Sequence, residues 1–154
     1  MNTAINRLLD TDSGLGPLVL RIPVGIIFAA HGAQKLFAWF GGYGLDGTGQ
    51  FFASIGLGPG YLMALLAGSA EFFGGLALIA GLLVRPAAAV LAFTMLVAIF
   101  TVHIGNGLFM SNNGYEFGLA LLAASVSLVF SGAGQASLDR LLLARFDSRV
   151  AAMA

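Results

Sequence analysis

The sequence predicts an all-α membrane protein: a bundle of four transmembrane helices with both termini in the cytoplasm and a short amphipathic C-terminal helix. Of its 154 residues, 58% are hydrophobic and 9% are charged, whereas about 25% of the residues in a soluble domain are charged. Four long apolar segments are separated by connections rich in glycine and proline. Lipid is therefore the expected solvent for most of the chain, which we interpret as one domain.

Four stretches approach the ~20 mainly apolar residues that a helix needs to cross a bilayer. They cover residues 17–40, 60–84, 86–104 and 115–131. Pro17, Pro59 and Pro86 lie at or next to the starts of the first three. Proline costs little there because the first N–H groups of a helix have no helical partner. The stretches lack the alternation of β-barrel strands, so we expect helices.

The basic residues predict the orientation. Those outside the spans share one side of the membrane: Arg7, Arg85, Arg140, Arg145 and Arg149. The opposite connections, 41–60 and 105–114, carry only Asp46 as a charge. By the positive-inside rule, both termini are expected to face the cytoplasm. The protein is expected in the inner membrane of the cell, which it crosses several times. The tail, 137–150, mixes leucines with charges and is expected to lie on the inner surface as an amphipathic helix.

Composition excludes several functions. The chain has no cysteine, which removes disulfides, thiolate metal sites and iron–sulfur clusters. Its formal net charge is zero and its basic residues are scattered, which argues against nucleic-acid binding.

Ionisable side chains within the membrane are the candidate functional residues. Each costs about 2.5–3.5 kcal/mol to insert, so each needs a partner or a function. Six fall within or at the ends of the spans: Arg21, His31, Lys35, Glu71, His103 and Glu116. The topology places five of them in the outer half of the bilayer and Arg21 nearer the cytoplasm.

The first span gathers polar groups on one face. Arg21, Phe28 and Lys35 are spaced by seven residues and are nearly in line on a helix, with His31 within about 60° of that line. Glu71 lies near the middle of the second span among small residues that let another helix approach. It is therefore expected to point into the bundle, either in a structural ion pair with Lys35 or in a proton or ligand site.

Structural interpretations exist for the other candidates. Arg21 and Lys35 are near enough to helix ends to reach water by snorkelling. His103 and Glu116 could be solvated residues at the outer interface. His31 could be a packing histidine or a functional one.

The sequence gives little support to three cofactors: a dinucleotide, a haem and a single metal ion. The segment 42–47 fits G-x-G-x-x-G, but it follows a membrane helix instead of a strand, which argues against nicotinamide or flavin dinucleotide binding. His31 and His103 could ligate a haem, yet helical rise places them about 7 Å apart along the membrane normal. A single metal held by His31, Glu71, His103 and Glu116 lacks a Glu-x-x-His spacing.

The same residues resemble the DoxX-like membrane proteins. The resemblance covers about 18–142 and rests on Arg21, the run from His31 to Leu36 (HGAQKL), Glu71 within AEFFGG, Arg85-Pro86, and His103. It implies a four-helix membrane bundle. It also implies an association with oxidoreduction, because family members are linked to quinol oxidase or thiosulfate:quinone systems and to oxidative and quinone stress.

Our first hypothesis is a component of a membrane oxidoreductase that interacts with a quinone or quinol. His31 and Lys35 would hydrogen-bond a quinone oxygen, and Glu71 would exchange protons. Phe28, Phe37, Trp39 and Phe72 would supply apolar walls, and the remaining ligand-binding candidates are Arg21, His103 and Glu116. Electrons would come from a soluble redox partner or a bound small molecule.

Two alternatives differ in class. One is a non-enzymatic membrane subunit that recruits a redox partner through the cytoplasmic tail. The other is a transporter of protons or small solutes, which needs a polar line from Arg21 through Glu71 to His103. Gly114-x-x-x-Gly118 and Ala70-x-x-x-Gly74 are close-packing motifs that serve either one bundle or a homo-oligomer.

Overall fold

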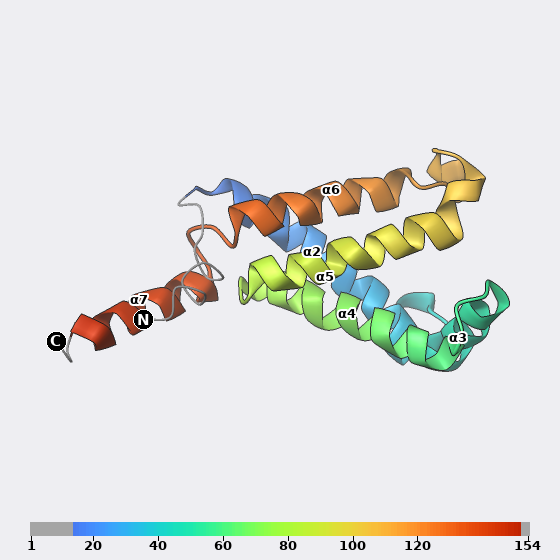
Figure 1. The fold of residues 1–154 in the computed structure, drawn as a ribbon, viewed down its shortest axis with the longest axis horizontal. Coiled ribbons are helices and arrows are strands. Elements are labelled where there is room, and N and C mark those ends of the chain that lie inside the picture. The colour runs from blue at the N-terminus through green and yellow to red at the C-terminus, as the bar shows by residue number, and fades with distance from the viewer. Residues whose placement is uncertain (1–13, 152–154) are drawn as a thin grey trace.

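The protein is a bundle of four long helices, with a short helix at one end and a projecting helix at the other (Figure 1). The structure is a computed structural model that describes residues 14–151 and the side chains of residues 14–145. Every regular element in this part of the chain is helical. The α-helices are α2 (Gly16–Phe37), α3 (Gly44–Ser54), α4 (Gly60–Ala80), α5 (Val84–Ala98), α6 (Glu116–Ser131) and α7 (Leu138–Ala151).

The four predicted membrane helices are confirmed, with shifted ends. Helix α2 stops at Phe37 because Ala38 is left-handed (φ 58°), and α4 stops at Ala80 because Gly81 is left-handed (φ 68°). Helix α5 continues through a π-helical turn, Ile99–His103, and a 3-10 turn, Ile104–Asn106. Among the described helices, α2, α4 and the continuous α5 segment are long and apolar enough to span a bilayer; α6 is apolar but has 16 residues.

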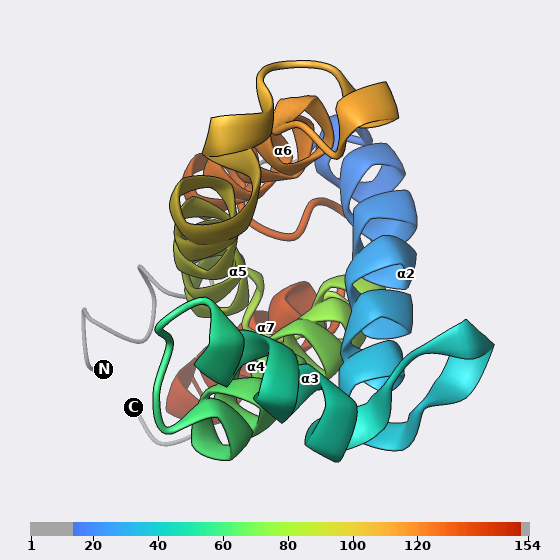
Figure 2. The same cartoon turned by 90° about the vertical axis from the view of Figure 1, so that its right-hand side faces the viewer.

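The four helices stand around a common axis in the order α2, α4, α5, α6 (Figure 2). Packing is most extensive between α2 and α4 and between α5 and α6, whereas α2 and α6 meet at few positions. The core contains Phe28, Leu78, Leu91 and Leu128, all fully buried. Large apolar side chains are exposed on the outside of every long helix, for example Val19, Phe73, Phe93 and Phe130. Such a surface suits contact with lipid tails.

Glycines fix the register of α2 against α4. A Cβ atom added at Gly25 would lie 2.7 Å from the carbonyl oxygen of Gly75, and one added at Gly32 would lie 2.6 Å from Cα of Phe72. The two backbones therefore approach more closely than larger residues permit. This register sets the height at which side chains of α2 meet those of α4.

The motifs proposed for self-association are used within one bundle. Gly74 faces Leu91 of α5, and Gly118 faces Ile99, with added Cβ atoms at 3.1 Å in both cases. Gly114 is buried against the backbone of Gly107 and Leu108. These contacts explain the small residues without a second copy, and a homo-oligomer stays a prediction.

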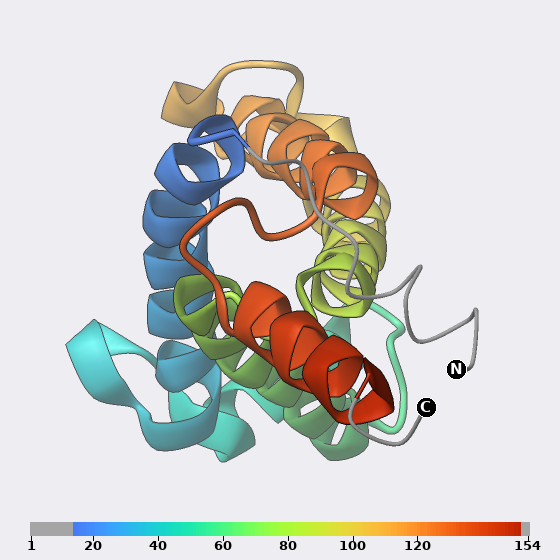
Figure 3. The same ribbon diagram turned by 90° about the vertical axis from the view of Figure 1, so that its left-hand side faces the viewer.

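Two expectations need correction. The connection 41–60 is not only loop, because α3 occupies Gly44–Ser54 and packs on α4 through Thr48 and Gly49. The tail is helical as predicted. However, α7 leaves the bundle roughly along the bundle's long axis (Figures 1 and 3), not flat across its end. Arg7 and the side chain of Arg149, on which the predicted orientation partly rests, lie outside the described residues.

Candidate functional site

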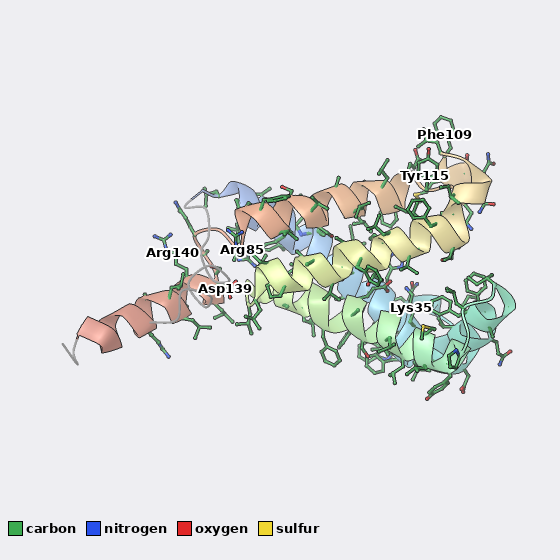
Figure 4. All side chains as sticks on the ribbon, in the orientation of Figure 1. Lys35, Arg85, Phe109, Tyr115, Asp139 and Arg140 are labelled. Carbon is green, nitrogen blue, oxygen red and sulfur yellow. The ribbon has the colours of Figure 1, made fainter. Side chains whose placement is uncertain are left out.

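A buried ion pair joins α2 to α4. The Nζ atom of Lys35 lies 2.6 Å from Oε2 of Glu71. The Glu71 side chain is 4% exposed and that of Lys35 is 22% exposed. Figure 4 shows Lys35 in the half of the bundle nearer to α3. Because a lone buried charge is far more costly than a paired one, each residue stabilises the ionised form of the other.

His31 lies one helical turn before Lys35 and faces the α2–α6 seam. Its ring centroid is 6.1 Å from that of Phe117 of α6, with the planes at 49°. His31 is exposed in the described structure, so the ring is not enclosed in the core. We refer to His31, Lys35 and Glu71 as the outer polar site.

Aromatic side chains flank the α2–α4 side of this site. Phe37 packs edge-on against Phe72, with ring centroids 5.3 Å apart, and stacks at 5.2 Å with Trp39. Trp39 lies just beyond α2, in the 3-10 turn Trp39–Gly41. Phe28 differs from these predicted lining residues because it is 1% exposed and belongs to the core cluster. The aromatic wall therefore consists of Phe37, Trp39 and Phe72.

His103 and Glu116 organise the loop between α5 and α6. The Nδ1 atom of His103 is 2.9 Å from the carbonyl oxygen of Asn113, and the backbone N–H of Met110 donates to Oε1 of Glu116 at 2.6 Å. Figure 4 shows Phe109 and Tyr115 in the same loop. Both predicted ligand-binding residues thus contact loop backbone and do not join the Lys35–Glu71 pair.

The acidic and histidine side chains that the structure describes do not form a metal-binding cluster. Within the described part of the chain, no three His, Cys, Asp or Glu residues are grouped so that they could hold a metal ion. The four residues weighed as a metal site are divided between the outer polar site and the α5–α6 loop.

Arg21 forms a separate centre at the other end of the bundle. Its side chain is 1% exposed. Nη1 donates to the carbonyl oxygens of Leu78 and Ile79, at 2.6 and 2.5 Å, in the last turn of α4. Nε donates to Ala133 at 2.8 Å, and Nη2 donates to Ala136. Since the last carbonyls of a helix lack helical partners and carry partial negative charge, the guanidinium caps α4 and ties it to the segment after α6.

Asp139 completes this centre from the start of α7. Its Oδ1 accepts the N–H of Leu83 at 2.7 Å, and its Oδ2 accepts that of Val84 at 3.1 Å. The carboxylate therefore caps the N-terminus of α5, where negative charge is favoured. Its backbone N–H donates to Gly81 at 2.9 Å. Burial raises the pKa of Asp139 above its ordinary value, against the opposing effects of the two N–H donors and of Arg21.

Comparison with known proteins identifies the family. The DoxX family profile matches residues 16–104, which is more than half of the chain. The chain belongs to the DoxX family. CatD of Bacillus subtilis, named "Putative oxidoreductase CatD", is 38% identical over 125 residues, covering 81% of this chain and 85% of CatD.

Other DoxX-related proteins are similarly close. The "Inner membrane protein YqjF" of Escherichia coli is 35% identical over 134 residues, covering 83% of this chain and 92% of YqjF. An uncharacterized protein of Haemophilus influenzae is 38% identical over 126 residues, covering 78% and 85%. No solved structure matches significantly. The apolar helices and these DoxX relatives together identify an inner-membrane protein.

The DoxX match contains the outer polar site and Arg21 but ends before α6. Two residues that complete the described centres, Phe117 and Asp139, lie beyond it and were not predicted. Phe117 had no signal, since an exposed phenylalanine in an apolar span looks like a lipid contact. Asp139 had no signal either, because the N–H groups that it binds lie 56 and 55 residues earlier in the chain.

Proposed function

We propose that this DoxX protein is a component of a membrane oxidoreductase and that its outer polar site interacts with a quinone or quinol. The observation that carries the proposal is the Lys35–Glu71 pair, at 2.6 Å and largely buried within a membrane bundle. Ionisable residues held inside a membrane mark functional sites more often than structural ones. The naming of CatD as a putative oxidoreductase supports the redox class.

The site offers the groups that quinone chemistry requires. Reduction of a quinone to a quinol takes up two electrons and two protons, one proton at each ring oxygen. His31 and Lys35 can donate hydrogen bonds to one oxygen. The paired Glu71 is ionised, so it can accept a proton from a quinol as the ring is oxidised, and it must first take up a proton before it can deliver one to a quinone. Phe37, Phe72 and Trp39 provide flat apolar contacts beside them. The electrons would come from a soluble partner protein or a small reduced carrier.

The test is mass spectrometry of small molecules that co-purify with the protein in native lipid particles. Wild type is compared with Glu71→Gln and with Asp46→Asn, a matched control that neutralises an exposed carboxylate in the first turn of α3. We expect a quinone in wild type and in the control, and its depletion in Glu71→Gln at equal protein yield. Equal quinone in all three samples, or none in any, would contradict the proposal.

A second candidate is a non-enzymatic subunit that recruits a redox partner. The direction of α7 favours it, since this helix projects from the bundle where a soluble protein can reach it (Figure 3). Removal of residues 141–154 would then abolish oxidoreductase activity of the complex while Glu71→Gln, in a stable background, would leave it intact. Under the first proposal the effects are reversed.

The structure gives less support to a transporter. Between Arg21 and Glu71, the described core contains Phe28, Leu78 and Leu91, which are 0–1% exposed. Arg21 donates four hydrogen bonds to backbone carbonyls. The polar line that transport requires is therefore interrupted within the described residues.

A further inference from the structure

A shallow cavity, open to the surface, lies at the base of α7, at the end of the bundle opposite α3. It has a volume of about 520 Å³ and is lined by the end of α4 and the start of α7, including Ala80, Gln135, Leu138, Arg140 and Leu141. A neighbouring cavity of about 250 Å³ shares Leu138 and Leu141 and is lined in addition by Leu82, Leu142 and Arg145. Because both cavities share these two leucines, we refer to the two cavities together as the groove. Neither cavity belongs to the outer polar site.

The walls of this groove combine apolar and basic side chains. Leu138 is 42% exposed and Leu141 is 61% exposed, although α7 has already left the apolar part of the bundle. Arg140 is exposed beside the first cavity, and Arg145 lines the second. Exposed leucines at this position need a partner, because contiguous apolar patches mark interaction sites. Figure 4 shows Arg85, Asp139 and Arg140 gathered at this end of the bundle.

The groove is held in shape by the centre that Arg21 and Asp139 form at this end of the bundle. The first turn of α7 is tied to the α4–α5 turn by Asp139, which binds the N–H groups of Leu83 and Val84. The Ser137 hydroxyl donates to the carbonyl oxygen of Gly134 at 2.9 Å and accepts the N–H of Arg140 at 3.3 Å. Arg140 and the two leucines therefore stand on a backbone that is fixed relative to α4 and α5.

We propose that this groove binds an anionic phospholipid, whose phosphate pairs with Arg140 while its acyl chains cover Leu138 and Leu141. Its position favours a lipid over other occupants. The groove lies where α4 ends and α5 begins, at the boundary of the apolar bundle, next to Leu83, which is 47% exposed. Leu82 lines the second cavity and precedes the exposed Leu83, so apolar side chains lead from the groove toward the helix surface that suits lipid tails. Basic residues at such a boundary attract anionic head groups, at about 1 kcal/mol each.

The test is native mass spectrometry of the full-length protein, delipidated in a neutral detergent and titrated with dioleoyl-phosphatidylglycerol or dioleoyl-phosphatidylcholine. The variants are Arg140→Gln, Arg140→Lys and Leu141→Ser. Arg85→Gln is the matched control, because Arg85 carries the same charge at the same end but lines neither cavity and donates to the carbonyl of Val129 at 2.8 Å. Arg140 and Leu141 are exposed, so these variants are expected to fold.

We expect wild type to retain one phosphatidylglycerol in preference to phosphatidylcholine. Arg140→Gln should weaken this binding about fivefold, Leu141→Ser should weaken it for both lipids, and Arg140→Lys and Arg85→Gln should retain it. The proposal is overturned if phosphatidylcholine binds as tightly as phosphatidylglycerol, or if Arg85→Gln weakens binding as much as Arg140→Gln. Displacement of the lipid by an equal concentration of glycerol 3-phosphate would instead indicate a site for free phosphate esters and would also overturn it.

Discussion

Arg21 and Asp139 bind opposite sides of the same turn with opposite charges. The guanidinium of Arg21 donates to the last carbonyls of α4, at 2.5–2.6 Å. The carboxylate of Asp139 accepts the first N–H groups of α5, at 2.7 and 3.1 Å. Each charge therefore faces the helix end that it stabilises. This arrangement makes the end of the bundle near α7 a structural centre, distinct from the outer polar site.

Replacing Arg21 should destabilise the fold strongly. Arg21→Met keeps a long, unbranched side chain but removes the charge and the N–H donors. The carbonyls of Leu78, Ile79, Ala133 and Ala136 then lose their donors. An unsatisfied buried polar group costs about 1–3 kcal/mol, so we expect the free energy of unfolding to fall by about 3 kcal/mol or more. Unfolding in detergent measures it. The free energy of unfolding of Arg21→Lys should lie between those of wild type and Arg21→Met, because an ammonium group cannot reach all four carbonyls as the planar guanidinium does. If the free energy of unfolding of Arg21→Met equals that of wild type, the capping role is refuted.

The contribution of Asp139 to stability should depend on pH. Burial raises its pKa in the folded protein, so the folded state holds this proton more tightly than the unfolded state does. Stability linked to this proton is fully present below the ordinary pKa of the carboxyl and is lost as the pH rises through the raised pKa. The melting temperature of wild type relative to Asp139→Asn should therefore fall as the pH rises from about 4, near the ordinary aspartate pKa, toward neutrality. If the melting temperature of wild type instead rises relative to that of Asp139→Asn as the pH increases, the folded protein prefers the ionised carboxylate.

The sequence was sufficient to predict the four membrane helices because each depends on local properties. Long apolar runs and helix-start prolines need no knowledge of the rest of the chain. Helix α3 was missed for a related reason. Its segment contains Gly44, Gly47 and Gly49, which disfavour an isolated helix, and it is helical because it packs on α4, where an added Cβ at Gly49 would lie 3.0 Å from Tyr61 Cα.

The candidate site was predicted in part. The Lys35–Glu71 pair could be anticipated because a mid-membrane carboxylate needs a partner and Lys35 was the one lysine or arginine predicted in the outer half. The partners of Arg21 could not, because backbone carbonyls 57 and 112 residues away leave no mark on the sequence. His103 and Glu116 lie at the α5–α6 connection, where the predicted spans put them, but their loop contacts depend on a chain path that side-chain types do not reveal.

Close packing of α2 on α4 should control the outer polar site. In Gly32→Ala, the new Cβ would lie 2.6 Å from Cα of Phe72, next to Glu71. The helices must separate, which costs about 1–3 kcal/mol for an overpacked contact, and the Lys35–Glu71 distance should increase. Gly105→Ala is the control because an added Cβ there meets nothing within 4 Å. Thermal unfolding of both variants measures the effect, and equal melting temperatures would show that α2 and α4 tolerate a larger separation.

A double-mutant cycle on Lys35 and Glu71 separates their structural role from their functional one. Glu71→Gln leaves a partly buried ammonium without its counter-ion, and Lys35→Met leaves a buried carboxylate alone. Removing one partner of a buried pair costs about 3–5 kcal/mol, with the lower end expected here because the Lys35 side chain is 22% exposed.

The double variant Lys35→Met/Glu71→Gln contains neither charge, so most of the lost stability should return. Unfolding free energies of the four proteins measure the coupling. If the double variant is stable but no longer retains a quinone, the charges serve the ligand as well as the fold. If it is stable and retains the quinone as wild type does, the pair is not needed to hold the ligand, and a role of Glu71 in proton transfer would then require that this variant has lost oxidoreductase activity.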